Sequence, residues 1–183
     1  MPDQIHNATS ALEEWSAVLA TREGLQLHVR SVNPDDGALI KSFLEGLAPD
    51  DLRYRFLTPL VHPSASLIDS LVRVDHVGTE DFLAFADVDG RKAPIATAML
   101  AADPSLVRAE VAIAILPEYQ KRGVGWTLLE FVAKDAAARG IKTLESVESR
   151  DNHAAIDLER EMGFTACAYP GDATLMLVRK KLN

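Results

Sequence analysis

The hydrophobic pattern changes period repeatedly along the chain, which indicates helices and strands mixed within one compact unit. Residues 25–32 alternate apolar and polar side chains, the period-two pattern of a half-buried strand. Further strands are predicted at 108–116 and 143–149, in two runs within 82–100 joined by a turn at Asp89-Gly90, and around a turn at Pro170-Gly171. Helices are predicted at 9–22, 34–47, 49–57, 63–74, 123–139 and 152–163.

Two of these strands, 108–116 and 143–149, are separated by a helix-sized segment. A crossover of this length is what parallel strand pairing requires, so we predict that the two strands are parallel neighbours in one mixed sheet. The domain that contains them is predicted to span residues 25–183. Residues 1–24 are predicted to form a helical extension that packs on this body, and an arm facing a partner is an equal alternative.

The composition and net charge restrict the classes of partner that the chain is expected to bind. Among 183 residues, 48% are hydrophobic and 25% charged, as in an ordinary globular protein, and 19 Lys and Arg stand against 27 Asp and Glu. The resulting charge of −8 argues against a nucleic-acid surface and is compatible with a cationic substrate. Neither a membrane-spanning apolar run nor a secretion signal is found, so we expect a soluble cytoplasmic protein with no membrane partner.

The cysteine and histidine content predicts neither a disulfide nor a metal site. Cys167 is the only cysteine, which fits a reducing compartment, and we interpret it as a small buried hydrophobe. The five histidines include no pair at ligand spacing, so no metal is assigned. His153 is interpreted as a solvated residue at the start of a helix.

The segment YQKRGVGWTLLE, residues 119–130, concentrates positive charge and glycine ahead of a predicted helix. A helix that starts near Gly123 leaves backbone N–H groups without partners, and its dipole places partial positive charge there. Gly123 and Gly125 would let a phosphate approach the main chain, and Lys121 and Arg122 would add charge. A tight strand-to-helix turn without a ligand is the alternative. The segment lacks the Gly-Lys-Ser/Thr of a Walker loop and the third glycine of a dinucleotide fingerprint.

Two motifs resemble those of the GCN5-related N-acetyltransferase (GNAT) superfamily. Residues 120–125, QKRGVG, resemble its acetyl-CoA signature Q/R-x-x-G-x-G/A, and residues 152–164, NHAAIDLEREMGF, resemble its second motif. The resemblance covers about residues 82–180. It implies the GNAT fold, an α/β (mixed α+β) domain with a central, largely antiparallel sheet, a splayed parallel strand pair and flanking helices.

The resemblance also implies acetyl-CoA as cosubstrate and places it. The pantetheine arm would pair with the backbone of Ile113, Ala114 and Ile115. The remaining residues implied in cofactor binding are Lys121, Arg122, Gly123, Val124, Gly125 and Trp126 around the pyrophosphate, together with Asn152.

Acetyl transfer to an amine needs a base, because an alkylamine is almost fully protonated near neutral pH. Glu110 shares one strand face with Ala112 and Ala114, which leave room for an acyl group and an amine, so Glu110 is the candidate base. A solvated strand-end carboxylate is the alternative, and Glu148 is a reserve base. Glu159 occupies the place where many superfamily members carry a tyrosine as general acid, which leaves no acid assigned.

The placement of Glu110, ten residues before Gln120, and the early segment LAPDDLRYRFL, 47–57, resemble bacterial protein-lysine acetyltransferases of this superfamily. Tyr54 and Phe56 within that segment could equally be core residues. The leading hypothesis is therefore transfer of acetyl to a protein lysine. Transfer to a small amine and a non-catalytic acyl-CoA-binding module remain alternatives. The oligomeric state is not predicted.

Overall fold

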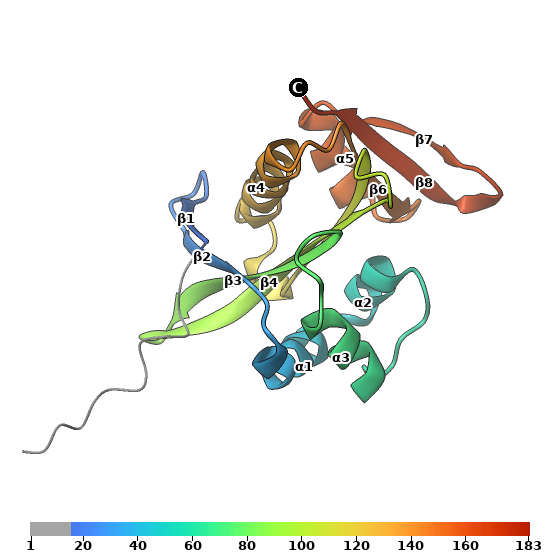
Figure 1. Ribbon diagram of the computed structural model, residues 1–183. Coiled ribbons are helices and arrows are strands. Elements are labelled where there is room, and N and C mark those ends of the chain that lie inside the picture. The colour runs from blue at the N-terminus through green and yellow to red at the C-terminus, as the bar shows by residue number, and fades with distance from the viewer. Residues whose placement is uncertain (1–15) are drawn as a thin grey trace, which may run out of the picture.

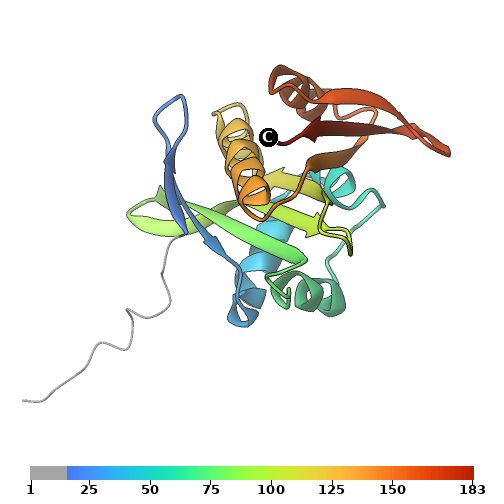
Figure 2. The same ribbon diagram turned by 45° about the horizontal axis from the view of Figure 1, so that its top comes forward.

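The computed structural model describes residues 16–183, which form one eight-stranded sheet with helices on both faces (Figures 1 and 2). The strand order is β1-β2-β3-β4-β5-β6-β8-β7. All pairings among the described strands are antiparallel except β5 with β6, which are parallel. The predicted mixed fold with one parallel pair is therefore confirmed.

The predicted elements from residue 25 onward are found close to their expected positions. The strands are β1 Ala17–Ala20, β2 Gln26–Ser31, β3 Thr79–Val88, β4 Arg91–Ala102, β5 Arg108–Ile115, β6 Thr143–Ser149, β7 Thr165–Tyr169 and β8 Asp172–Lys181. The α-helices are α1 Gly37–Gly46, α2 Pro49–Phe56, α3 Ala65–Val72, α4 Val124–Ala138 and α5 His153–Glu161, with short 3-10 helices η1 Pro34–Asp36 and η2 Pro117–Tyr119.

The expected N-terminal helix over 9–22 is wrong in the part that the structure describes, because residues 17–20 form strand β1. Its apolar residues do recur at helical spacing, but Leu19 packs on the core while Val18 is 57% exposed, the alternation of an edge strand paired with β2. Residues 1–15 lie outside the described part of the chain. Cys167, expected to be buried, is exposed on β7, the outermost strand of the sheet that the described residues form.

Each face of the sheet has its own hydrophobic core. On one face α4 and α5 cover a cluster that includes Leu128, Val132 and Leu144, all fully buried. On the opposite face α1, α2 and α3 cover a second cluster around Phe43 and Leu83 (Figure 1). The sheet is thus fixed from both sides, which holds β5 and β6 in place at its centre.

Strands β5 and β6 separate soon after they meet. They pair only from Arg108 opposite Thr143 to Glu110 opposite Glu145, although β5 continues to Ile115 and β6 to Ser149. Beyond that point β5 keeps its antiparallel partner β4, and β6 keeps β8. The sheet therefore contains a fork, and the main-chain groups of β5 on the fork side have no strand partner among the described residues.

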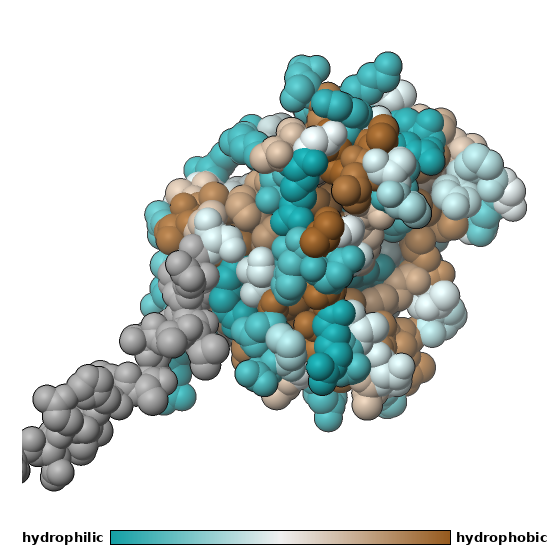
Figure 3. All heavy atoms as spheres, in the orientation of Figure 1, coloured by the Kyte–Doolittle hydropathy of each residue, from teal (hydrophilic) through white to brown (hydrophobic). Residues whose placement is uncertain are grey.

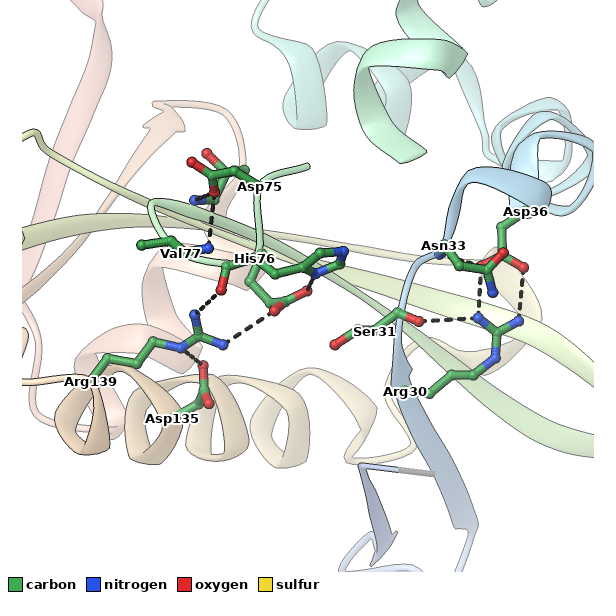
Figure 4. A network of polar contacts seen from close by, with 11 residues as sticks. Arg30, Ser31, Asn33, Asp36, Asp75, His76, Val77, Asp135 and Arg139 are labelled. Carbon is green, nitrogen blue, oxygen red and sulfur yellow. Dashed lines mark hydrogen bonds and ion pairs between the residues drawn. The ribbon is translucent and has the colours of Figure 1, made fainter. Parts of the chain in front are cut away.

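Two ion-pair clusters, one buried and one partly exposed, fix the ends of elements around this framework (Figure 4). Arg30 on β2 donates two hydrogen bonds, of 2.7 and 2.8 Å, to the carboxylate of Asp36 at the start of α1. Arg139 at the end of α4 donates to the buried Glu80 on β3 at 3.2 Å and to Asp135 at 2.6 Å. Such bidentate and networked pairs give fixed geometry as well as charge compensation. None of the helices described in residues 16–183 is long and apolar enough to cross a membrane.

Candidate active site

A cavity of about 330 Å³ lies at the fork between β5 and β6. Its walls come from α2, from β5, from the loop and first turn of α4, and from β6 and α5. In the space-filling view a recess opens between α2 below and the β6–α5 region above (Figure 3). A volume of this order is sufficient for part of a small-molecule ligand.

The glycine loop forms the end of the cavity at α4. The first amide bonded within the helix is that of Thr127, which donates to the Gly123 carbonyl at 3.1 Å. The amides of Val124, Gly125 and Trp126 therefore have no acceptor within their own helix. Gly123 has φ +76° and Lys121 φ +57°, and left-handed turns of this kind form concavities of N–H groups that hold anions. These features fit a pyrophosphate.

Neighbouring segments clamp this loop in place. The Gln120 side-chain amide donates to Asp51 on α2 at 3.0 Å and to the Ile115 carbonyl at 3.2 Å. On the other side, the β1–β2 turn places Arg22 over the Trp126 ring at 3.9 Å. The loop is thus held between the first strands and α2, two contacts that the sequence alone did not suggest.

Glu110 stands at the last paired position of β5 and lines the cavity. Desolvation raises its pKa, the charge of Arg55 on α2 lowers it, and Glu145 across the strand pair raises it, with an upward net direction. Arg55 also lies close to Asp81, a buried carboxyl whose pKa rises to about 7 because of burial. The guanidinium is thus shared between Glu110 and Asp81, and this compensates charge next to the candidate base.

Two more carboxyls line the cavity from the β6–α5 side. Glu148 accepts a hydrogen bond from the Asn152 side-chain amide at 2.8 Å, and burial together with the charge of Glu159 raises its pKa to about 8. Glu159 is 5% exposed, accepts a hydrogen bond from the Ser146 hydroxyl, and has its pKa raised to about 7 by burial. Both groups therefore hold protons in the neutral pH range.

The structure brings together all but one of the residues selected from the sequence. Around the cavity lie Glu110, Ile113, Ala114, Ile115, Lys121, Gly123, Val124, Gly125, Trp126 and Asn152, with the reserve base Glu148. Arg122 is the exception, and its guanidinium lies over the Tyr119 ring at 5.3 Å.

Sequence reasoning missed Asp51 and Arg55 as cavity residues and left Tyr54 undecided. Tyr54 lines the cavity, whereas Phe56 packs on the core. Asp51 lines the cavity from α2. Asp51 accepts a hydrogen bond from the Gln120 side-chain amide and so connects α2 to the glycine loop. This contact depends on three-dimensional packing and leaves no local sequence pattern.

Comparisons with known proteins agree with this architecture. The family model of the acetyltransferase (GNAT) family matches residues 49–164, and the chain belongs to that family. It is an N-acetyltransferase, an enzyme that transfers an acetyl group to an amine.

Individual relatives extend the match over nearly the whole chain. "Acetyltransferase PA5475" of Pseudomonas aeruginosa is 27% identical over 176 residues, which cover 96% of this chain and 95% of the relative. The GNAT domain of S. lividans PAT superposes with a TM-score of 0.81 at 26% identity, over 91% of this chain and 96% of that one. Spermidine N-acetyltransferase from Vibrio cholerae, in complex with CoA and spermine, shares the fold with a TM-score of 0.68 at 17% identity, over 85% and 95% of the two chains.

Proposed function

We propose that this protein uses acetyl-CoA to acetylate a lysine side chain of a protein, with Glu110 as the general base. The observation that carries the proposal is the position of Glu110 at the mouth of the fork, in the same cavity as the glycine loop. This arrangement would bring a phosphate-binding helix end and a proton acceptor to opposite ends of one ligand.

Acetyl-CoA is proposed to lie along β5, with its pyrophosphate on the free amides of residues 121–126. Beyond Glu110, the fork-side edge of β5 offers main-chain groups to the amides of the pantetheine at Ile113, Ala114 and Ile115. Asn152 lines the same channel from α5. Lys121 adds a positive charge beside the loop, whereas Arg122 is proposed to reach the phosphates from outside the cavity.

The base is needed because a lysine amine of pKa ~10.4 is neutral to only about one part in 10³ near pH 7. The raised pKa of Glu110 makes this carboxylate a better proton acceptor than a free glutamate. Ala112 and Ala114 follow it on β5 and leave space for the acetyl group and the incoming nitrogen. In this reaction the nitrogen attacks the thioester carbon while its proton passes to Glu110, directly or through water.

A cationic acceptor matches the charge of the cavity. The carboxylates of Asp51 and Glu110 line it, and the chain as a whole carries −8. One feature favours a protein lysine over a small amine, the position of Tyr54 and Arg55 at the cavity. These two belong to the early segment that resembles protein-lysine acetyltransferases.

The test gives labelled acetyl-CoA and the purified protein to two sets of acceptors: the proteins of a bacterial lysate, and a panel of polyamines, aminoglycosides and amino acids. The matched control is Glu110→Gln, which also measures spontaneous acetylation. We expect label on lysine side chains of a limited set of proteins, located by mass spectrometry of peptides and strongly reduced with the variant.

Label confined to the small amines would transfer the proposal to that acceptor class. Binding of acetyl-CoA in calorimetry without transfer to either set would identify a binding module and reject the enzymatic proposal for this chain.

A further inference from the structure

A buried carboxyl that the proposed base chemistry does not use lies on the β6–α5 wall of the cavity. Glu159 is 5% exposed, and one of its oxygens, Oε1, accepts the hydroxyl of Ser146. The other oxygen, Oε2, is buried without a hydrogen-bond partner among residues 16–183. Because buried polar atoms are nearly always paired, an unpaired oxygen on a cavity wall indicates a group that meets a ligand.

The position of Glu159 places it at the fork itself. Ser146, which holds it, is the first residue of β6 after Glu145, the last one paired with β5. Glu110 stands at the same level of β5, because it is the partner of Glu145. Glu110 on β5 and Glu159 on α5, held by Ser146 of β6, thus lie near the point where the two strands diverge, and both line the same cavity.

The surroundings of Glu159 favour its protonated form. Glu148 on β6 interacts with it electrostatically. Glu110 of β5 lines the same cavity, while the cations of the cavity, Arg55 and Lys121, belong to α2 and to the glycine loop. Burial raises the pKa of Glu159 to about 7, and the Ser146 hydrogen bond opposes that rise. Near neutral pH a substantial fraction of Glu159 therefore carries a proton that it can donate.

We infer that Glu159 is the general acid that protonates the departing sulfur of acetyl-CoA, an inference that rests on the proposed acetyl transfer. As the carbon–sulfur bond breaks, its electron pair goes to sulfur and the proton of Glu159 Oε2 forms the S–H bond. Acetyl remains on the acceptor nitrogen, whose surplus proton has passed to Glu110. The acceptor arrives as an ammonium and loses its first proton through Glu110 to solvent before the attack. Solvent then takes the second proton from Glu110 and returns one to Glu159, so each turnover releases one proton.

The alternative donor on the same wall is Glu148. Its Oε2 already accepts a hydrogen bond from the Asn152 side-chain amide at 2.8 Å, whereas Oε2 of Glu159 has no hydrogen-bond partner among residues 16–183. An acid near pKa 7 also transfers its proton favourably to a thiolate whose conjugate acid has a pKa of ~8.5. Glu159 is therefore the better placed and better matched donor.

The experiment compares the pH dependence of kcat for wild type, Glu159→Gln and Glu148→Gln on the acceptor identified above. In wild type kcat should fall as pH rises through the pKa of Glu159, since the acid is then deprotonated. Glu159→Gln keeps the shape and can still accept the Ser146 hydroxyl, yet it has no proton to give. We expect kcat to fall by about 10²-fold at pH 7 and the alkaline limb to disappear, whereas Glu148→Gln should keep that limb.

Two further variants separate acid catalysis from a structural role. Ser146→Ala removes the hydrogen bond that lowers the pKa of Glu159, so the alkaline limb should move to higher pH. Glu159→Tyr supplies an acid of pKa ~10 and should restore part of the rate, with the limb shifted upward by about three pH units. Calorimetric binding of CoA verifies that each variant is folded.

A wild-type profile without an alkaline limb, or a Glu159→Gln profile that keeps one, would overturn the inference and assign Glu159 to structure. Failure of the wild-type protein to acetylate any acceptor would instead reject the proposed function itself.

Discussion

Gly123→Ala tests how the structure builds the phosphate-binding end of the cavity, and the other end of the same helix provides a matched control. Gly123 precedes α4 with φ +76°, and Gly140 follows it with φ +87°. An alanine in this left-handed region costs roughly 1–2 kcal/mol at either position. The surroundings differ, because a Cβ at Gly140 meets nothing within 4 Å, whereas a Cβ at Gly123 would lie 3.2 Å from Cβ of Thr21.

Thr21 cannot easily yield to that contact. It is 4% exposed, its N–H donates to the Leu25 carbonyl at 2.9 Å, and its hydroxyl accepts the Leu25 amide at 3.1 Å. Overpacking against a fixed neighbour costs typically about 1–3 kcal/mol, so Gly123→Ala should lose roughly 2–5 kcal/mol of unfolding free energy and Gly140→Ala roughly 1–2.

Urea denaturation of both variants measures the two losses, and calorimetry measures the affinity for CoA. We expect the larger loss of stability and a clear loss of CoA affinity for Gly123→Ala, with unchanged affinity for Gly140→Ala. Equal losses of stability in the two variants would refute the contact between the β1–β2 turn and the glycine loop.

Two more predictions concern the cavity. Gly125→Asp should weaken CoA binding by well over tenfold in calorimetry, because it adds a negative charge beside the pyrophosphate and a Cβ 3.3 Å from Leu158. Unchanged affinity in the folded variant would reject the site. The control Gly125→Ala adds the Cβ without the charge and so separates the two effects. Glu148 has a pKa of about 8 in the folded protein against ~4.3 unfolded. The folded state therefore holds a proton in this window that the unfolded chain has released, and wild-type stability falls as pH rises through it. Glu148→Gln should accordingly gain stability over wild type between about pH 5 and pH 8 in urea denaturation, and a difference independent of pH would contradict the raised pKa.

Local pattern was sufficient to predict most of the fold. Period-two alternation located β2, the Asp89-Gly90 turn located the β3–β4 hairpin, and the helix-sized crossover predicted that β5 and β6 are parallel. Each of these signals is contained within a few residues or in the length of one connection. For β1, the helical spacing of apolar residues was misleading, because pairing with the edge of β2 outweighs local periodicity.

The only parts of the candidate site that could be predicted from the sequence are those where the backbone geometry requires a particular residue type. Gly123 and Gly125 reveal the loop because a side chain would occupy space there. The role of Arg55 could not be inferred in the same way, since its partners Asp81 and Glu110 are distant in sequence and are brought together by the packing of α2 against the sheet. The burial of Glu159 likewise depends on α5 meeting β6 at Ser146.

The measurement that tests the central claim most directly is kcat of Glu110→Gln on a lysine acceptor, with Glu145→Gln as the control. Glu145 is paired opposite Glu110 on β6, and its charge raises the pKa of Glu110. We predict that Glu110→Gln lowers kcat by about 10²-fold or more with little change in acetyl-CoA affinity, and that the acid limb of the pH profile disappears. Glu145→Gln should keep kcat within a few-fold and move the acid limb to lower pH. Full activity of Glu110→Gln across that pH range would contradict the account and assign proton removal to Glu148 or to water.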